Sequence, residues 1–242
     1  MRQREWKIIL IAAAILIDLA IILAVYLLWP RTSDAEVPSQ GIASDVSMPE
    51  TESPLESIDL GSGLKLTKLS EVTGNFPEDG SDEFVESMLS ATFLNEGERA
   101  IQYASVKVTA GEETYSFVFS TLPEGKSVRV FEANKKNLAG TPSTVSAEIE
   151  TLAYFQEEPS IYENDLDITI SDGVICVKNI SEKDIDTEIS VFYKTVSGDT
   201  FIGGITYRLR VPAGLASGEV YRGNAMHAAE KMSKVMFVTY GE

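Results

Sequence analysis

The chain has 242 residues and a formal net charge of −17, with 37 acidic against 20 basic residues. A surface of that sign repels phosphate backbones, so nucleic acid is excluded as an expected partner. One cysteine, Cys176, excludes an intrachain disulfide, and one histidine, His227, excludes a histidine-based metal site or a Ser-His-Asp triad.

The first predicted element is a membrane-spanning helix over residues 8–29, preceded by a cytoplasmic tail at residues 1–7. At about 1.5 Å per residue, this apolar run matches the roughly 30 Å hydrocarbon core of a bilayer. Basic residues cluster before it, so the positive-inside rule places the rest of the chain outside the cell. Tyr26 and Trp29 are expected to anchor the helix at the outer interface. The run is longer than a signal-peptide core and no A-x-A site directly follows, which favours an uncleaved anchor.

Asp18 lies at the middle of this predicted helix. A central Asp costs about 2.5–3.5 kcal/mol on insertion, which the surrounding apolar residues offset at about 0.3–0.6 kcal/mol each. Ala13, Ala20 and Ala24 share the face roughly opposite Asp18 and would let a second helix approach closely. We hypothesise that these four residues contact a partner membrane helix. The alternative, an unpaired and protonated Asp18 in a plain anchor, stays open.

Residues 30–63 are rich in serine, proline and acidic residues, and their apolar residues follow no period. Such a segment cannot bury enough surface to offset its ordering entropy. We predict a disordered acidic linker that holds the folded part away from the membrane, with an acidic docking tail as the alternative.

From Leu64 onward, short alternating runs bounded by Gly, Pro, Asn and Asp indicate an all-β structure. Turns about every ten residues predict two tandem β-sandwich domains, at residues 64–157 and 158–242. The expected strands are Leu64–Val72, Glu86–Asn95, Ile101–Ala110, Glu113–Leu122, Ser127–Ala133, Ser143–Phe155, Leu166–Ser171, Val174–Asn179, Thr187–Thr195, Thr200–Val211, Ala216–Tyr221 and Lys234–Tyr240.

The two sets of strands follow the same order, which indicates an internal duplication. In each half a strand ends at an asparagine, Asn95 or Asn179, and a later strand reaches a Pro-x-Gly turn, at residues 123–125 or 212–214. The crossing at residues 224–234 contains helix formers after an asparagine, so we expect one or two helical turns there.

The second half carries a set of turn and core residues that resembles the FxLYD-type domains of Gram-positive surface proteins. These residues are Val177-Lys-Asn179, Val191-Phe-Tyr193, Gly198 and Pro212-Ala-Gly214. Ser190 and Lys194 depart from the motif where Phe and Asp would be expected, and the first half is more diverged. The resemblance implies an immunoglobulin-like fold at the cell surface, and it brings no catalytic residues with it.

The sequence contains no motif for catalysis, and we predict no catalytic, cofactor-binding or metal-binding residue. It has no P-loop, G-x-G-x-x-G or G-x-S-x-G. Carboxylates cluster at residues 78–83, 163–167 and 182–188, without the spacing of a calcium loop, so solvated turn charges are favoured over weak calcium binding. We expect Cys176 to be a small buried hydrophobe and His227 to be solvated.

Aromatic residues Tyr115, Phe117 and Phe119 alternate along one predicted strand and so share one face. A sandwich core accounts for them, and a surface patch for a partner is the alternative.

Three functions follow from these features. The first is a non-catalytic interaction module, an accessory or scaffold subunit of a cell-envelope assembly, with the membrane and a protein as its partners. The second is a sensor or regulator ectodomain, against which the short tail at residues 1–7 counts. The third is an extracellular hydrolase, which the missing catalytic residues and the lack of an aromatic sugar platform disfavour.

Overall fold

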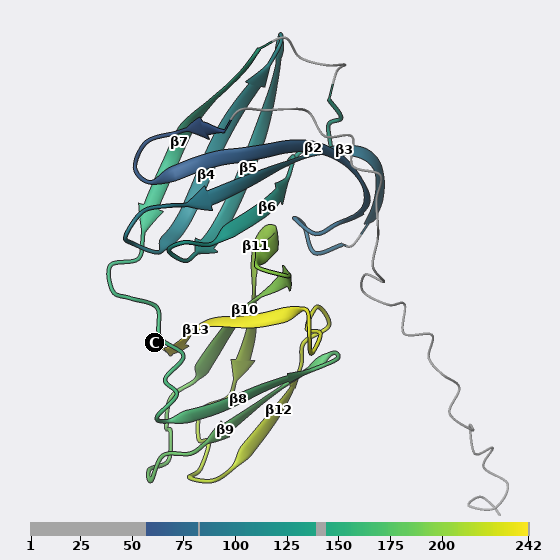
Figure 1. Ribbon diagram of the computed structural model, residues 1–242. Helices are drawn as coiled ribbons and strands as arrows, with labels where there is room; N and C mark the ends of the chain where they lie inside the picture. The colour runs from purple at the N-terminus through teal and green to yellow at the C-terminus, as the bar shows by residue number, and fades with distance from the viewer. Residues whose placement is uncertain (1–56, 82, 139–143, 242) are drawn as a thin grey trace, which may run out of the picture. The chain divides into compact units, whose positions relative to one another are not determined.

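A computed structural model describes residues 57–81, 83–138 and 144–241, and every described element in it is a β-strand (Figure 1). The predicted membrane helix and most of the predicted linker lie outside the described residues. Within the described part of the chain, no helix is long and apolar enough to cross a membrane. The expected all-β class is therefore confirmed for these residues.

The strands follow the predicted alternation closely. They are β1 (Ile58–Asp59), β2 (Leu64–Phe76), β3 (Glu83–Asn95), β4 (Ile101–Ala110), β5 (Glu113–Leu122), β6 (Ser127–Phe131), β7 (Val145–Tyr154), β8 (Leu166–Ser171), β9 (Val174–Asn179), β10 (Ile189–Ser197), β11 (Thr200–Val211), β12 (Val220–Asn224) and β13 (Ser233–Tyr240). The hairpins β4–β5 and β8–β9 have the expected bounds, because short turns at Gly111 and Gly173, both with positive φ, delimit them.

Three local predictions were wrong. Strand β1 lies inside the expected linker and pairs with β2. The strand expected at Ala216–Tyr221 is shifted, because residues 216–219 contain a turn and β12 begins at Val220. Residues 225–232 form turns instead of a helix, with hydrogen bonds between residues three positions apart, from the N–H of Ala228 to the Ala225 carbonyl at 2.8 Å and from the N–H of Met232 to the Ala229 carbonyl at 3.1 Å.

The order of strands in the sheets repeats between the two halves. Strands β2, β3 and β6 are neighbours in one sheet as β8, β9 and β12 are in another, and β5-β4-β7 corresponds to β11-β10-β13. In each half the two sheets contribute residues to one hydrophobic core. Tyr115, Phe117 and Phe119 are buried in the first of these cores, which confirms the core interpretation for them.

The asparagines that end β3 and β9 play the same structural role. Nδ2 of each donates to the carbonyl four positions later and to a leucine carbonyl, Leu122 for Asn95 and Leu215 for Asn179, at 2.8–3.1 Å. Each side chain therefore closes its own charged turn and fixes it to a distant segment, the end of β5 for Asn95 and the bridge residue Leu215 after β11 for Asn179. These hydrogen bonds support the duplication independently of the strand order.

The same hydrogen bonds correct the predicted match between turns. The N–H of Gly125 donates to the Asn95 carbonyl at 2.8 Å, and the N–H of Gly218 donates to the Asn179 carbonyl at 2.9 Å. Gly218 is thus the counterpart of Gly125, and the turn at residues 212–214 is an addition in the second half. This added turn is held by Ile185, whose carbonyl accepts the N–H of Gly214 at 2.9 Å and which forms a β-bridge with Leu215.

A single seven-stranded sheet joins the two halves. Strand β6 pairs in parallel with β11, with Ser127 opposite Thr200 and Val128 opposite Phe201 (Figure 1). Phe201 and Met236, both from the second half, are buried in the core of the first half. The halves are therefore joined by backbone pairing and by apolar packing.

The two cores lie on opposite faces of this sheet. On β10, Val196 packs against the first core, while Val191 and Tyr193 are buried in the second. Side chains an odd number of positions apart on a strand point to opposite faces. One face of the long sheet is therefore covered by β5-β4-β7 and the other by β12-β9-β8.

Candidate functional site

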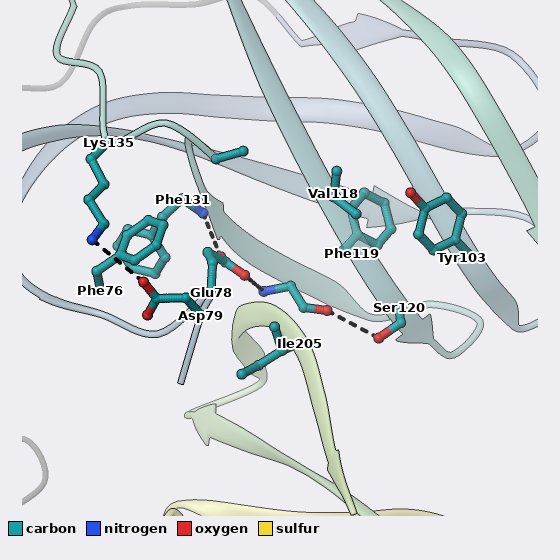
Figure 2. Close-up of a pocket in the computed structure, with 12 residues that line it drawn as sticks. Phe76, Glu78, Asp79, Tyr103, Val118, Phe119, Ser120, Phe131, Lys135 and Ile205 are labelled. Carbon is teal, nitrogen blue, oxygen red and sulfur yellow. Dashed lines mark hydrogen bonds and ion pairs between the residues drawn. The ribbon is translucent and has the colours of Figure 1, made fainter. Parts of the chain in front are cut away.

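A pocket of about 420 Å³ lies beside the β6–β11 pairing (Figure 2). Its walls come from β4, β5 and β11, from the turn between β2 and β3, and from the segment around β6. The lining residues are Phe76, Glu78, Asp79, Tyr103, Val118, Phe119, Ser120, Phe131, Ala133, Lys135, Gly204 and Ile205.

Glu78 binds two strands through one carboxylate. Its Oε1 accepts the N–H of Phe131 at 2.8 Å, and its Oε2 accepts the N–H of Gly204 at 2.6 Å (Figure 2). Phe131 ends β6 and Gly204 lies within β11, so Glu78 connects these strands beyond their paired residues. Burial raises the pKa of Glu78 from 4.5 to about 7, against the lowering effect of these hydrogen bonds and of the Lys194 charge.

Lys194 on β10 is fully buried next to this carboxylate. Its Nζ donates to the carbonyls of Ser120 at 3.0 Å, Gly204 at 3.1 Å and Ile205 at 2.8 Å. Burial lowers the pKa of Lys194 from 10.5 to about 7, and the Glu78 charge opposes that shift. All three ammonium donors thus bind backbone carbonyls of β5 and β11.

Gly204 connects the half-buried Glu78 and the buried Lys194, because its N–H donates to Glu78 and its carbonyl accepts from Lys194. The β10–β11 register passes from Tyr193 opposite Tyr207 to Thr195 opposite Ile202, so β11 bulges at this point. A Cβ on Gly204 would lie 1.9 Å from the Val118 carbonyl oxygen. Only glycine allows β11 to pass this close to the edge of β5.

Charged groups at the rim of the pocket pair with one another. Nζ of Lys135 lies 3.5 Å from Asp79, also binds Glu83, and sits 4.7 Å from the centre of the Phe76 ring. Apolar side chains are exposed here, since Tyr103 is 39% and Val118 is 37% exposed. The pocket therefore has an exposed apolar wall, while its charged groups form ion pairs and hydrogen bonds within the protein. This arrangement is better suited to binding a ligand than to catalysis.

The predicted membrane-helix residues Asp18, Ala13, Ala20 and Ala24, and the interface residues Tyr26 and Trp29, all lie outside the described residues. Within the described ranges, no three His, Cys, Asp or Glu side chains are close enough to hold a metal ion.

Cys176 and His227 are both half-buried, whereas Cys176 was expected to be buried and His227 to be solvated. Cys176 is a free thiol. The ring of His227 stacks on the ring of Tyr207, with 4.5 Å between the ring centroids.

The central pair of this site was missed in the sequence. Glu78 was grouped with solvated turn carboxylates, and Lys194 was noted only as a departure from a motif. The adjacent glycines Gly203 and Gly204 inside a predicted strand are the signal that was available, because glycine within a strand indicates a bulge or a close backbone contact.

The buried pair predicts how stability depends on pH. In Glu78 the folded pKa of about 7 exceeds the unfolded value of 4.5, so the folded state binds more protons between those values. Its contribution is complete below about pH 4.5 and is lost as the pH rises through about 7. For Lys194 the folded pKa is the lower one, so its contribution is complete above about pH 10.5 and is lost as the pH falls through about 7.

We therefore expect the unfolding free energy of the wild type to fall, relative to that of Glu78→Gln, as the pH rises from about 4.5 to about 7. Urea unfolding of the full-length chain in detergent, followed by far-UV circular dichroism, measures both proteins across this window. Because all other carboxyls are common to the two proteins, the difference reports Glu78 together with its charge coupling to Lys194. Parallel pH profiles would contradict the assignment.

No protein-family model matches this chain, and no curated protein matches it either.

Proposed function

We propose that the chain is a single-pass, membrane-anchored, extracellular and non-catalytic interaction module. It serves as an accessory or scaffold subunit of a cell-envelope assembly. The observation that carries the proposal is that the charged side chains in the interior bind the backbone. The buried Lys194 and Glu132 and the half-buried Glu78 each bind backbone groups of the fold, while Tyr103 and Val118 expose apolar surface beside the pocket. Buried ionisable groups are the usual catalytic candidates, and here they bind backbone.

Sequence features support the location in this proposal. The apolar run at residues 8–29 has the length of a membrane span, and the basic residues precede it. The resemblance to FxLYD-type domains agrees with two immunoglobulin-like sandwiches at residues 64–157 and 158–242, displayed at a Gram-positive surface. The shared seven-stranded sheet suits a scaffold, because it holds the binding surfaces of both halves in a fixed arrangement.

Partner binding in this proposal involves two regions of the chain. Asp18, with the small residues Ala13, Ala20 and Ala24, contacts a membrane helix of the assembly, since an intramembrane carboxyl is most stable when paired. The exposed apolar wall around Tyr103 contacts a second protein outside the membrane.

Site-specific photo-crosslinking in intact cells tests the proposal. A photoreactive residue at Tyr103 or Val118 should give a discrete protein adduct, whereas the same residue at the exposed position Lys178, on β9, should not. Surface protease should digest the described part of the chain in whole cells. Asp18→Leu should remove the partner from detergent-extracted complexes, and Asp18→Asn should retain it. Protection from protease, or the absence of any discrete adduct at Tyr103 and Val118, would overturn the proposal.

A further inference from the structure

A second pocket, of about 580 Å³, lies where β10 and β13 meet the segment that follows β7. We call it the aromatic groove. Its lining residues are Gln102, Ser120, Thr121, Phe155, Glu157, Glu158, Pro159, Ser160, Tyr162, Phe192, Thr206, Phe237, Val238 and Thr239.

Partly exposed aromatic rings form the base of this groove. The Phe192 and Phe237 rings stack with centroids 4.3 Å apart, and Phe155 meets Phe237 edge-on at 5.2 Å. At the rim, Tyr162 meets Tyr240 edge-on at 4.8 Å and is itself 38% exposed. A row of rings at the surface offers negative faces to a cation and apolar contact to its neighbours.

The charge of the groove has one sign. Glu157 and Glu158 are both exposed and are the only ionisable acids or bases among the lining residues apart from the Tyr162 phenol. Beside Tyr162, the pKa of Tyr240 is raised first by burial and then by the negative charge of Asp165. Two basic residues lie near the groove without lining it: Nη2 of Arg99 donates to the Phe155 carbonyl at 3.1 Å, and Arg208 lies opposite Phe192 across the β10–β11 pair.

We infer that the aromatic groove binds an extended basic peptide segment of a protein partner, with a lysine or arginine side chain over the rings and beside Glu157 and Glu158. The inference rests on the proposed function and adds the chemistry of the partner. Charge complementarity selects this occupant, because an aromatic face attracts a cation and the two carboxylates add to that attraction. The acidic linker at residues 30–63 of the same chain would be repelled.

The backbone also indicates how the peptide lies. The N–H of Val238 on β13 already donates to the Ser160 carbonyl at 2.8 Å, so the segment after β7 occupies this edge of the sheet. The peptide therefore lies across the ring faces and does not add a strand to β13. Affinity then depends on side-chain contacts, with Tyr162 and the glutamates as the accessible ones.

Titration of the full-length chain in detergent with designed peptides tests the inference. The probe is an end-capped eight-residue peptide that alternates lysine with phenylalanine, and its twin carries glutamate in place of lysine. We expect saturable binding of the basic peptide by calorimetry, at least tenfold weaker binding of the acidic twin, and weakening with added salt. The double variant Glu157→Gln/Glu158→Gln and the variant Tyr162→Ala should each weaken binding of the basic peptide about threefold to tenfold.

A matched control separates the groove from the general acidity of the chain. Glu112→Gln/Glu113→Gln removes the same charge at the exposed β4–β5 turn and should leave affinity unchanged. The inference would be overturned by equal loss of affinity in both double variants, by equal affinity for the basic and the acidic peptide, or by preferential binding of a neutral oligosaccharide.

The two proposals can fail separately. If photo-crosslinking gives discrete adducts at Tyr103 but the basic peptide does not bind, the groove inference is wrong and the proposed function stands. If the basic peptide binds but no adduct forms, the proposed function is wrong and the groove inference stands.

Discussion

Replacing Gly204 with alanine is expected to lower the unfolding free energy by about 3 kcal/mol or more. The new Cβ would lie 1.9 Å from the Val118 carbonyl oxygen and 2.9 Å from Oε2 of Glu78. The first contact is with backbone, so relief requires β11 to move away from β5. That movement lengthens the hydrogen bonds that Glu78 and Lys194 make to Gly204. Urea unfolding of the full-length chain, followed by far-UV circular dichroism, measures the loss.

The control for this substitution is Gly214→Ala. Gly214 has a φ of 91°, and a Cβ built there meets nothing within 4 Å. Alanine at this position should therefore cost only the backbone strain of about 1–2 kcal/mol. If both variants lose the same free energy, steric contact between β11 and β5 does not explain the glycine at position 204.

The second large effect is expected for Lys194→Ala, which should cost about 3–5 kcal/mol. Removing the ammonium leaves the carbonyls of Ser120, Gly204 and Ile205 without their donor, and it leaves the Glu78 carboxylate buried without a positive charge. Lys194→Met keeps most of the side-chain volume, so it should cost less than the alanine variant.

A double-mutant cycle tests the coupling between the two charges. We expect the combination of Glu78→Gln and Lys194→Met to be destabilised by less than the sum of the single variants, since neither charge is then left alone in the interior. Additive losses would show that Lys194 stabilises the bulge only through its carbonyl contacts.

The strands and their hairpins were predictable because their signals are local. Alternation of apolar residues sets the faces of β4 and β5, and Gly111 marks the turn between them. The duplication was also visible, through Asn95 and Asn179. The turn match failed at residues 212–214, since a Pro-x-Gly pattern does not reveal which carbonyl its glycine will bind.

The candidate site could not be predicted in the same way. Glu78 and Gly204 are 126 positions apart and meet only because β6 and β11 pair at their edges. In the sequence, Glu78 sits among other acidic turn residues and Lys194 within an ordinary alternating run, so neither position shows that it will be buried. The rings of the aromatic groove also come from separate segments, with Phe155 after β7, Phe192 on β10 and Phe237 on β13.

Side-chain periodicity and turn residues within a few positions of each other were enough to predict most of the strands, the β4–β5 and β8–β9 turns, and the repeated order of elements in the two halves. The shared sheet, the meeting of Glu78 and Lys194 at Gly204, and the positions of the pocket and the aromatic groove arise from contacts between segments far apart in the chain, which form only on folding. The pairing of two strand edges leaves no periodic pattern in the sequence, because it depends on the shape and the unsatisfied backbone groups of two folded surfaces.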